Sequence, residues 1–366
     1  MNHTTVQKPN LSGLDKKDFQ RSIDGKKTDL FILRNKKGME IAATNYGAAI
    51  LAIMAPDRQG HYANVILGHD NIEDVIHSPE PFLSTTIGRY GNRIAKGRFT
   101  LDGKTYTLAV NNGPNSLHGG PKGFHAAVWE AEQTAENAVA FRHTSPDGDE
   151  GFPGCLSVLM TYTLDDDNAL TIHYEATTDK KTIVNLTNHG FFNLAGIGCP
   201  TPSAEGHVVT IHADFYIPTD DVSIPTGEIA KVEGTPMDFR TPHAIGERIN
   251  DAFQQLKFGA GYDHCYVLDK REPGELSFAA RCVDPGSGRC MEVYTTEPGL
   301  QLYTGNWLNG FSGTHGATYP ARSAVCFEAQ HFPDSPNRPY FPSAVLEPGG
   351  KYTQTTVYKF GTEPQD

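Results

Sequence analysis

One histidine and one glutamate in this chain have neighbours that suit proton transfer. His189 lies in residues 185–194, a stretch of amides, hydroxyls and aromatic rings with a single histidine, and histidine gains or releases a proton near neutral pH. Glu328 lies between apolar residues in a strand-like run, where an unpaired carboxylate is costly to bury. Each also has an ordinary explanation: His189 as a core histidine bonded to neighbouring amides, and Glu328 as a paired carboxylate.

Further stretches combine polar groups with aromatic rings or glycines, and each again allows two interpretations. A ligand-binding interpretation would use the Arg93 guanidinium as a fork for hydroxyls or a carboxylate, and Asp263 as a hydroxyl acceptor. The ordinary interpretation is a surface salt bridge for residues 88–94 and a glycine-rich turn for residues 115–120. It is a turn or capping aspartate for residues 261–266, and a strand entered through a Pro-Gly turn for residues 297–307.

Bulk properties argue against several classes of function. The chain has 366 residues and a formal net charge of −12, whereas nucleic acids and anionic membranes attract basic surfaces. It contains no phosphate-binding G-x-x-x-x-G-K-[ST], no G-x-S-x-G and no H-E-x-x-H motif. The fifteen histidines form no obvious metal-binding pair, and the six cysteines form no C-x-x-C pair, so we expect reduced thiols and no metal.

Short alternating runs predict antiparallel strands. Asp102-Gly103 between two such runs predicts a hairpin, and period-two apolar residues predict strands over 156–164 and 170–176, joined by a turn at 165–168. Helical signals are few: Asn71 as the cap of a helix over 72–76, and Thr241-Pro242 as the start of another. Further strands are predicted over 208–217, 276–283, 291–296 and 352–360.

These elements predict an all-β protein, with one large antiparallel β domain whose sheets pack face to face or curl on each other. We place this domain at residues 25–366, after a polar N-terminal arm at residues 1–24. The first ten residues lack the apolar core of a secretion signal, and no window approaches 18 apolar residues. The expected location is therefore the cytoplasm.

Read together, the motifs resemble the aldose 1-epimerase family, also called galactose mutarotases. The resemblance spans roughly residues 25 to 360, and several of its motifs are individually rare. It implies a single large antiparallel β-sandwich of the galactose mutarotase type, with a sugar cleft across one concave face. Two departures, Tyr90-Gly91 and Gly190-Phe191, stand where Val-Ala and Ser-Tyr are common. The matching residues are 88–97, 115–120, 185–196, 224–228, 234–240, 262–264, 301–306 and 328–334.

The resemblance also implies a function: interconversion of the α and β anomers of free hexoses such as galactose and glucose. It makes Glu328 the base and His189 the acid, with His118 near the ring oxygen. A carboxylate in an apolar strand gains basicity, and we expect it to hold the facing histidine as an imidazolium. Resembling positions place Asn92, Arg93, His118, Asp263 and Gln301 in sugar binding.

The implied reaction uses no cofactor and no metal, and the expected partner is a small aldose bound by a monomer or homodimer, without nucleic acid or membrane. Two alternatives stay open at this point. One is a non-catalytic sugar-binding protein on the same scaffold. The other is a glycoside hydrolase in which Glu328 and Asp263 form the pair of carboxylates that flanks a glycosidic bond.

Overall fold

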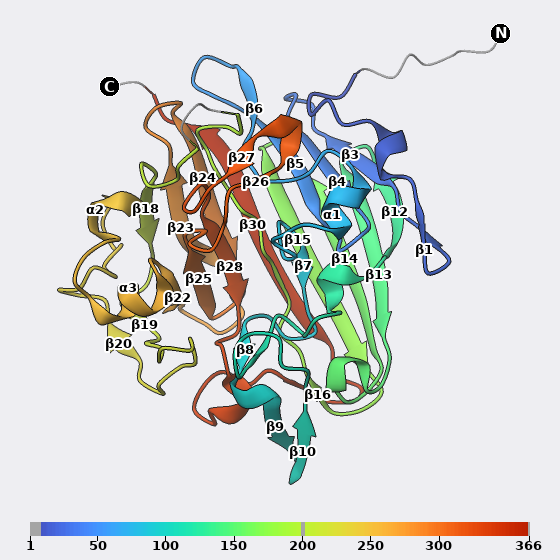
Figure 1. The fold of residues 1–366 in the computed structure, drawn as a ribbon, viewed down its shortest axis with the longest axis vertical. Coiled ribbons are helices and arrows are strands. Elements are labelled where there is room, and N and C mark those ends of the chain that lie inside the picture. Colours follow the sequence, from blue (N-terminus) through green and yellow to red (C-terminus); the bar gives the residue numbers. More distant parts are fainter. Residues whose placement is uncertain (1–8, 199–201, 365–366) are drawn as a thin grey trace.

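Antiparallel strands are the main regular elements of the computed structural model, which describes residues 9–198 and 202–364 (Figure 1). The largest sheet has nine strands. Their order is β12 (Glu130–Ala135), β13 (Ala138–Ser145), β14 (Leu156–Leu164), β15 (Ala169–Thr178), β30 (Tyr352–Thr362), β24 (Arg289–Thr295), β23 (Ser277–Val283), β18 (Val208–Ile211) and β21 (His243–Ala244).

Two smaller sheets complete the main layers. A five-stranded sheet has the order β20 (Ala230–Lys231), β19 (Phe215–Tyr216), β22 (Asp263–Val267), β25 (Gly299–Tyr303) and β28 (Cys326–Gln330). A four-stranded sheet consists of β3 (Leu30–Arg34), β4 (Glu40–Thr44), β5 (Ile50–Pro56) and β6 (Tyr62–Asn64). Short pairs include β7 (Thr86–Ile87) with β17 (Thr187–Asn188), and β8 (Arg93–Ile94) with β11 (Ser116–Leu117).

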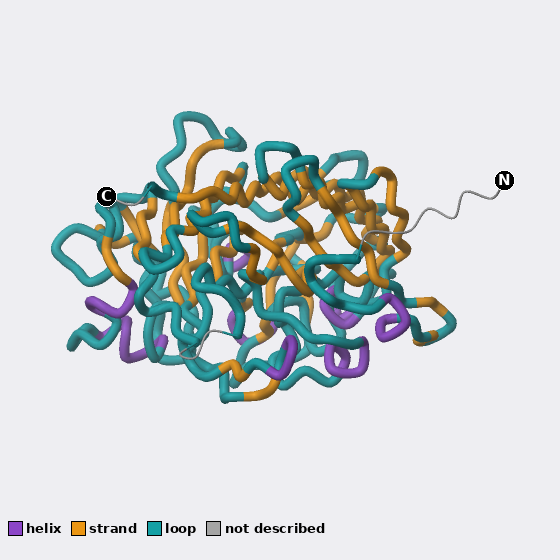
Figure 2. Tube along the Cα trace, turned by 90° about the horizontal axis from the view of Figure 1, so that it is seen from above, coloured by secondary structure: helices purple, strands orange, loops and turns teal. Residues whose placement is uncertain are grey.

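Alternation along the strands explains why the sheets pack on each other. In β14 every second side chain is buried, so one face of the nine-stranded sheet is apolar. Its Met160 and Tyr162 share one core cluster with Leu302 and Phe327 of the five-stranded sheet. The predicted all-β, antiparallel sandwich is therefore confirmed. Figure 2 shows the short helices along one side of this strand-rich body.

Several predicted elements are confirmed closely. The hairpin at Asp102-Gly103 joins β9 (Arg98–Leu101) to β10 (Lys104–Thr107), and the turn at 165–168 joins β14 to β15. Helix α1 (Ile72–Ile76) begins after Asn71, whose side-chain oxygen accepts the N–H of Asp74 at 2.9 Å.

Two predictions are wrong. The predicted strand over 208–217 is divided into β18 and β19, which belong to different sheets, because residues 212–214 cross between the layers while the apolar alternation continues. Thr241-Pro242 does not start a helix, because His243 pairs with Val209 in β21 and α2 (Ile245–Arg248) begins only afterwards. A third helix, α3 (Gln254–Gly259), was not predicted.

The described part of the N-terminal segment lies against the four-stranded sheet. Leu14 and Phe19 are buried in a cluster with Leu30 and Leu51, and the Glu40 carboxylate accepts the N–H groups of residues 11 and 12. The division of the chain at residue 25 stays a prediction. Within the described ranges no helix has the length and apolar character needed to cross a membrane. The five described cysteines are free thiols, and Cys199 lies outside the described residues.

Candidate active site

The floor of the candidate site is the outward face of β22, β25 and β28. Strand pairing places Gln301 opposite Glu328 on one side and opposite Cys265 on the other, and Asp263 lies two residues before Cys265 on the same face. The opposite face of these strands buries Leu302 and other apolar residues in the core. Three polar residues predicted from separate motifs are thus neighbours because of sheet register.

A chain of amides orients this floor. The Gln301 side-chain N–H donates to Asp263 Oδ1 at 2.7 Å, and its carbonyl oxygen accepts an N–H from the Gln330 side chain at 3.2 Å. Gln301 is therefore locked in one orientation. Glu328 Oε2 and Gln330 Oε1 are buried and have no hydrogen-bond partner among the described residues. Such orphaned acceptors facing a polar site fit the hydroxyl groups of a ligand.

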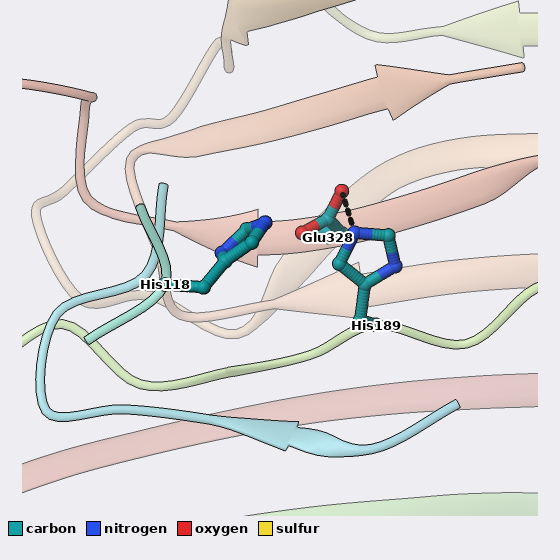
Figure 3. A group of neighbouring side chains, drawn as sticks. All are labelled: His118, His189 and Glu328. Atoms are coloured by element: carbon teal, nitrogen blue, oxygen red, sulfur yellow. Dashed lines mark ion pairs between the residues drawn. The ribbon is translucent and has the colours of Figure 1, made fainter. Parts of the chain in front are cut away.

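His189 is fixed by backbone and ring contacts above this floor. The backbone N–H of His189 donates to the carbonyl of Thr85, and the His189 carbonyl accepts the backbone N–H of Ser84. The imidazole stacks on the Phe191 ring with 4.8 Å between centroids. Its Nε2 atom lies 3.5 Å from Glu328 Oε1, and Figure 3 shows His189, His118 and Glu328 pointing toward one another. The pair is close enough for a proton to move between them after a small shift.

His118 is held in a single tautomer by its partner loop. The backbone N–H of Asn92 donates to His118 Nδ1 at 3.0 Å, so this nitrogen is an acceptor and the proton of the neutral ring is on Nε2. In return, the His118 N–H donates to the Asn92 carbonyl. The adjacent Gly119 has φ +83°, and a Cβ there would lie 2.0 Å from the Gly88 carbonyl oxygen, so glycine is required.

This tautomer bears on metal binding. Ligand atoms of His118, His189 and Glu328 lie within 4.8 Å of one another, which suits a metal ion by distance alone. A histidine that binds a metal through one nitrogen normally donates its other N–H to an acceptor. The Nδ1 of His118 instead accepts an N–H, so its Nε2 presents a proton rather than a lone pair. The donor set therefore fits a metal poorly and fits a hydrogen-bond acceptor well.

Burial controls the protonation of the facing pair. It raises the pKa of Glu328 well above its usual value, assisted by the Asp263 charge and opposed by Arg93. It also lowers the pKa of His189 to about 4. Both shifts favour the uncharged forms, which are a protonated Glu328 and a neutral His189. The sequence predicted an imidazolium at His189, but desolvation lowers the pKa of His189 by more than the Asp263 charge raises it.

Arg93 is positioned by a residue that the sequence analysis missed. Its Nε donates to Asn112 Oδ1 at 3.0 Å, and one terminal nitrogen lies 3.9 Å from Asp263 Oδ2. The guanidinium is largely buried, with 12% of its side chain exposed, so it is a desolvated cation beside the Glu328 floor. Asn112 immediately precedes the turn into residues 115–120, but no pattern in the sequence around Asn112 predicts a contact with Arg93.

The predicted site residues therefore come together. Asn92 and Arg93 from one loop, His118 from the next and His189 from a third surround Asp263, Gln301 and Glu328 of the sheet. Reasoning from sequence missed three further residues. They are Asn112, Gln330 and Phe82. The Phe82 ring contacts the rings of His118 and His125 with centroids 4.7 Å apart, and it stacks on the His189 ring at 6.3 Å. Gln330 follows Glu328 at strand period two, which was a usable signal.

Comparisons with known proteins agree with one another. A sequence profile described as "Aldose 1-epimerase" matches residues 29–359. The chain is 46% identical to a galactose mutarotase of Bos taurus over 323 residues, covering 88% of this chain and 91% of that protein. It is 38% identical to an aldose 1-epimerase of Escherichia coli, covering 93% and 97%. The crystal structure of an aldose epimerase homologue from C. elegans superimposes with a TM-score of 0.85 at 32% identity, covering 92% of this chain and 100% of that one.

Proposed function

The chain belongs to the aldose 1-epimerase family, and we propose that the facing Glu328–His189 pair performs the two proton transfers of its reaction. The enzyme interconverts the anomers of aldose sugars. The observation that carries the proposed roles is the 3.5 Å approach of His189 Nε2 to Glu328 Oε1 inside a buried, polar site.

Ring opening requires a base at the anomeric hydroxyl and an acid at the ring oxygen, the two oxygens bonded to C1. Glu328 removes the proton of the anomeric hydroxyl, and His189 protonates the ring oxygen as the C1–O5 bond breaks. The open-chain aldehyde then rotates about C1–C2 and recloses on its other face, with the same two groups acting in reverse. Each proton transfer contributes ~10²–10⁴-fold to the rate. No electron or phosphoryl group moves.

The single proton of the pair suits this chemistry. When a sugar hydroxyl binds at Glu328, the proton shifts to His189 Nε2 and leaves a carboxylate base beside an imidazolium acid. The buried His118, whose pKa burial lowers well below its usual value, stays neutral and donates its Nε2 proton in a hydrogen bond. His118 thus orients the ring oxygen toward His189. Sharing of the acid step by His118 requires a second proton that its surroundings disfavour.

The anchors hold the sugar while C1 opens. Asp263 and Gln301 form one bonded unit that accepts and donates hydrogen bonds, and Arg93 supplies a cation against the sugar hydroxyls. Asn92 contributes through its backbone N–H, which orients His118, and through its side-chain oxygen, which accepts the backbone N–H of Arg93 at 2.8 Å. Rigid anchoring lowers the entropy lost in reaching the transition state.

The function is tested by polarimetry. Freshly dissolved α-galactose or α-glucose is expected to approach its equilibrium rotation faster with the protein than without it, in proportion to enzyme concentration. Both hexoses are proposed substrates, and the ratio of kcat/KM values ranks them. A protein that binds these sugars in calorimetry without accelerating mutarotation would be a binding protein instead. Release of nitrophenol from aryl galactosides would indicate a hydrolase.

The pH dependence of kcat/KM follows from the shared proton. Between the lowered pKa of His189 and the raised pKa of Glu328 the pair holds one proton, and the rate is expected to form a plateau. Below about pH 4 His189 gains a second proton, so no base remains and the rate falls. Above the raised pKa of Glu328 the pair loses its proton, so no acid remains and the rate falls again. Polarimetry with α-glucose across pH 3–10 measures both limbs; a midpoint near pH 6.5 on the acid limb would contradict a desolvated His189.

The cellular compartment and the class of partner are proposed from the cysteines and the net charge. Five described cysteines without a disulfide fit a reducing compartment such as the cytoplasm, and the net charge of −12 fits a neutral sugar better than a nucleic acid. We expect a monomer or homodimer, which light scattering of the purified protein determines.

A further inference from the structure

We propose that Asn185 is a positioning residue of this site that acts through His118. Its side-chain amide holds the peptide group between Gly91 and Asn92, and that peptide group selects the tautomer of His118. The inference rests on the proposed role of His118 as a donor to the ring oxygen. Asn185 opens the stretch that contains His189, but it is 0% exposed and is therefore not presented to a sugar. Both polar atoms of its amide bond to the protein instead.

One peptide group joins Asn185 to His118. The Asn185 side-chain N–H donates to the Gly91 carbonyl oxygen at 3.0 Å. The N–H of the same peptide group, which belongs to Asn92, donates to His118 Nδ1 at 3.0 Å. Because a peptide group is planar and its carbonyl and N–H point in opposite directions, holding the carbonyl fixes the direction of the N–H. Asn185 therefore aims the donor that keeps the proton of the His118 ring on Nε2.

The same amide is held at its other end by the segment that follows the proposed base. Its Oδ1 accepts the backbone N–H of His331 at 2.9 Å, and its Nδ2 donates a second, longer bond to the His331 carbonyl at 3.4 Å. His331 directly follows β28, the strand of Glu328, and His331 Nδ1 lies 2.6 Å from Glu297 Oε2. The amide is thus oriented from the end of this strand, so Asn185 couples the position of His118 to the strand that carries Glu328.

The backbone of Asn185 supports the same loop independently of the side chain. Its N–H donates to the Arg89 carbonyl at 3.0 Å, and its carbonyl accepts the Gly91 N–H at 2.7 Å. Asn92, the residue after Gly91, has φ +63°, in the left-handed region that non-glycine residues adopt rarely. Such a conformation persists only where its surroundings hold it. Because the backbone bonds do not depend on the side chain at position 185, a substitution there is expected to keep the path of the loop and to release one peptide group.

The orientation of this peptide group decides which proton His118 offers. With the N–H toward the ring, Nδ1 accepts and the proton is on Nε2, and the ring points into the site (Figure 3). If the peptide group turned over, the Gly91 carbonyl would face Nδ1, and the ring proton would move to Nδ1 to meet it. Nε2 would then be an acceptor and would not donate to the ring oxygen. The chain of bonds from His331 through Asn185 opposes this reversal, because successive hydrogen bonds polarise one another.

The tautomer of His118 is the direct readout of the proposal. Long-range proton–nitrogen-15 correlation spectra distinguish a ring protonated on Nε2 from one protonated on Nδ1, and His118→Asn assigns the signal by its loss. Near neutral pH the parent is expected to show only the Nε2 form. Asn185→Ala removes the amide, and Asn185→Leu removes it while keeping the branched shape of the side chain. Both are expected to show a large fraction of the Nδ1 form, and a pure Nε2 form in either folded variant would overturn the proposal.

Kinetics test whether Asn185 acts only through His118. Asn185→Ala is expected to lower kcat for α-galactose by about tenfold, the value of one hydrogen bond lost at the transition state, with a smaller change in KM. In the His118→Asn background the same substitution is expected to cause no further loss, because the ring that the amide orients is gone. Equal losses in both backgrounds would mean that Asn185 supports the site in another way, and the proposal would fail.

The matched control is Asn45→Ala. Asn45 is also a buried asparagine that joins separate segments. Its Nδ2 donates to the carbonyls of Lys27 and Trp129 at 3.0 and 2.8 Å, and its Oδ1 accepts the N–H of Asp29 at 2.8 Å. This variant is expected to lose stability and to keep the kcat and the His118 tautomer of the parent. A tautomer change in Asn45→Ala as large as that in Asn185→Ala would show a general loosening of the protein and would refute the proposal.

The spectra and the kinetics separate this inference from the proposed role of His118. A changed tautomer with an unchanged kcat would support Asn185 as the residue that aims the peptide group, and it would refute only His118 as a donor in the reaction. An unchanged tautomer would refute the role of Asn185 whatever the kinetics show.

Discussion

Glu328→Gln is expected to lower kcat for α-galactose and α-glucose by ~10²–10⁴-fold, the range of one general acid–base step. Glutamine matches the size of glutamate and fills the same place opposite Gln301, so the strand register and the buried surface are kept. It cannot accept the anomeric proton, and it cannot share a proton with His189. Polarimetry measures the loss in kcat, and calorimetric titration is expected to show that the variant still binds sugar.

The same variant is expected to be at least as stable as the parent at pH 8. The pKa of Glu328 is raised on folding, so the folded state holds a proton that the unfolded chain releases. This group therefore opposes folding increasingly as pH rises from its ordinary value through its raised pKa, and the amide removes that penalty. Thermal unfolding followed by circular dichroism measures the difference, and a lower Tm at pH 8 would contradict this sign.

Glu40→Gln is the matched control for losing a buried carboxylate. Glu40 is 1% exposed and accepts the N–H groups of Leu11 and Ser12 and one from Arg34, all away from the site. We expect this variant to lose stability and to retain kcat. Full activity in Glu328→Gln would refute Glu328 as the base. A comparable loss of kcat in Glu40→Gln would show that the effect is structural.

His189→Asn is expected to produce a second large loss, again ~10²–10⁴-fold in kcat, with a smaller change in KM. Asparagine donates a hydrogen bond to the ring oxygen but transfers no proton. With the acid removed, Glu328 is the only remaining titrating member of the pair, and it works only when ionised. The residual kcat/KM is therefore expected to rise with pH up to the raised pKa of Glu328, in place of the basic limb of the parent.

His118→Asn provides the comparison that separates the two histidines. Because His118 Nδ1 accepts the Asn92 N–H, its role requires only a donor at the other end of the ring. An asparagine amide replaces that donor in part, so the loss is expected to be smaller than in His189→Asn and the basic limb is expected to persist. Equal losses and equal profiles in the two variants would mean that His118 transfers the proton as well.

Much of the fold was accessible from the sequence for a local reason. Apolar residues at period two in 156–164 and the Asp-Gly turn at 102–103 specify strands and a hairpin through contacts within a few residues. The segment 208–217 was mispredicted because alternation says which face is buried and not which sheet a strand joins. His243 likewise pairs with Val209 across more than thirty positions, which no local pattern encodes.

The candidate site shows the same difference between what local sequence predicts and what long-range packing decides. The sequence by itself determined which side chains are available, and the resemblance of its motifs to the family predicted the roles of Glu328, His189 and the anchors. Only the tertiary structure decided their state. Strand register placed Gln301 against Glu328, a backbone N–H selected the tautomer of His118, and burial favoured the uncharged forms of Glu328 and His189. Proton affinity depends on the solvent and charges around a group, and those surroundings exist only when distant segments have packed together.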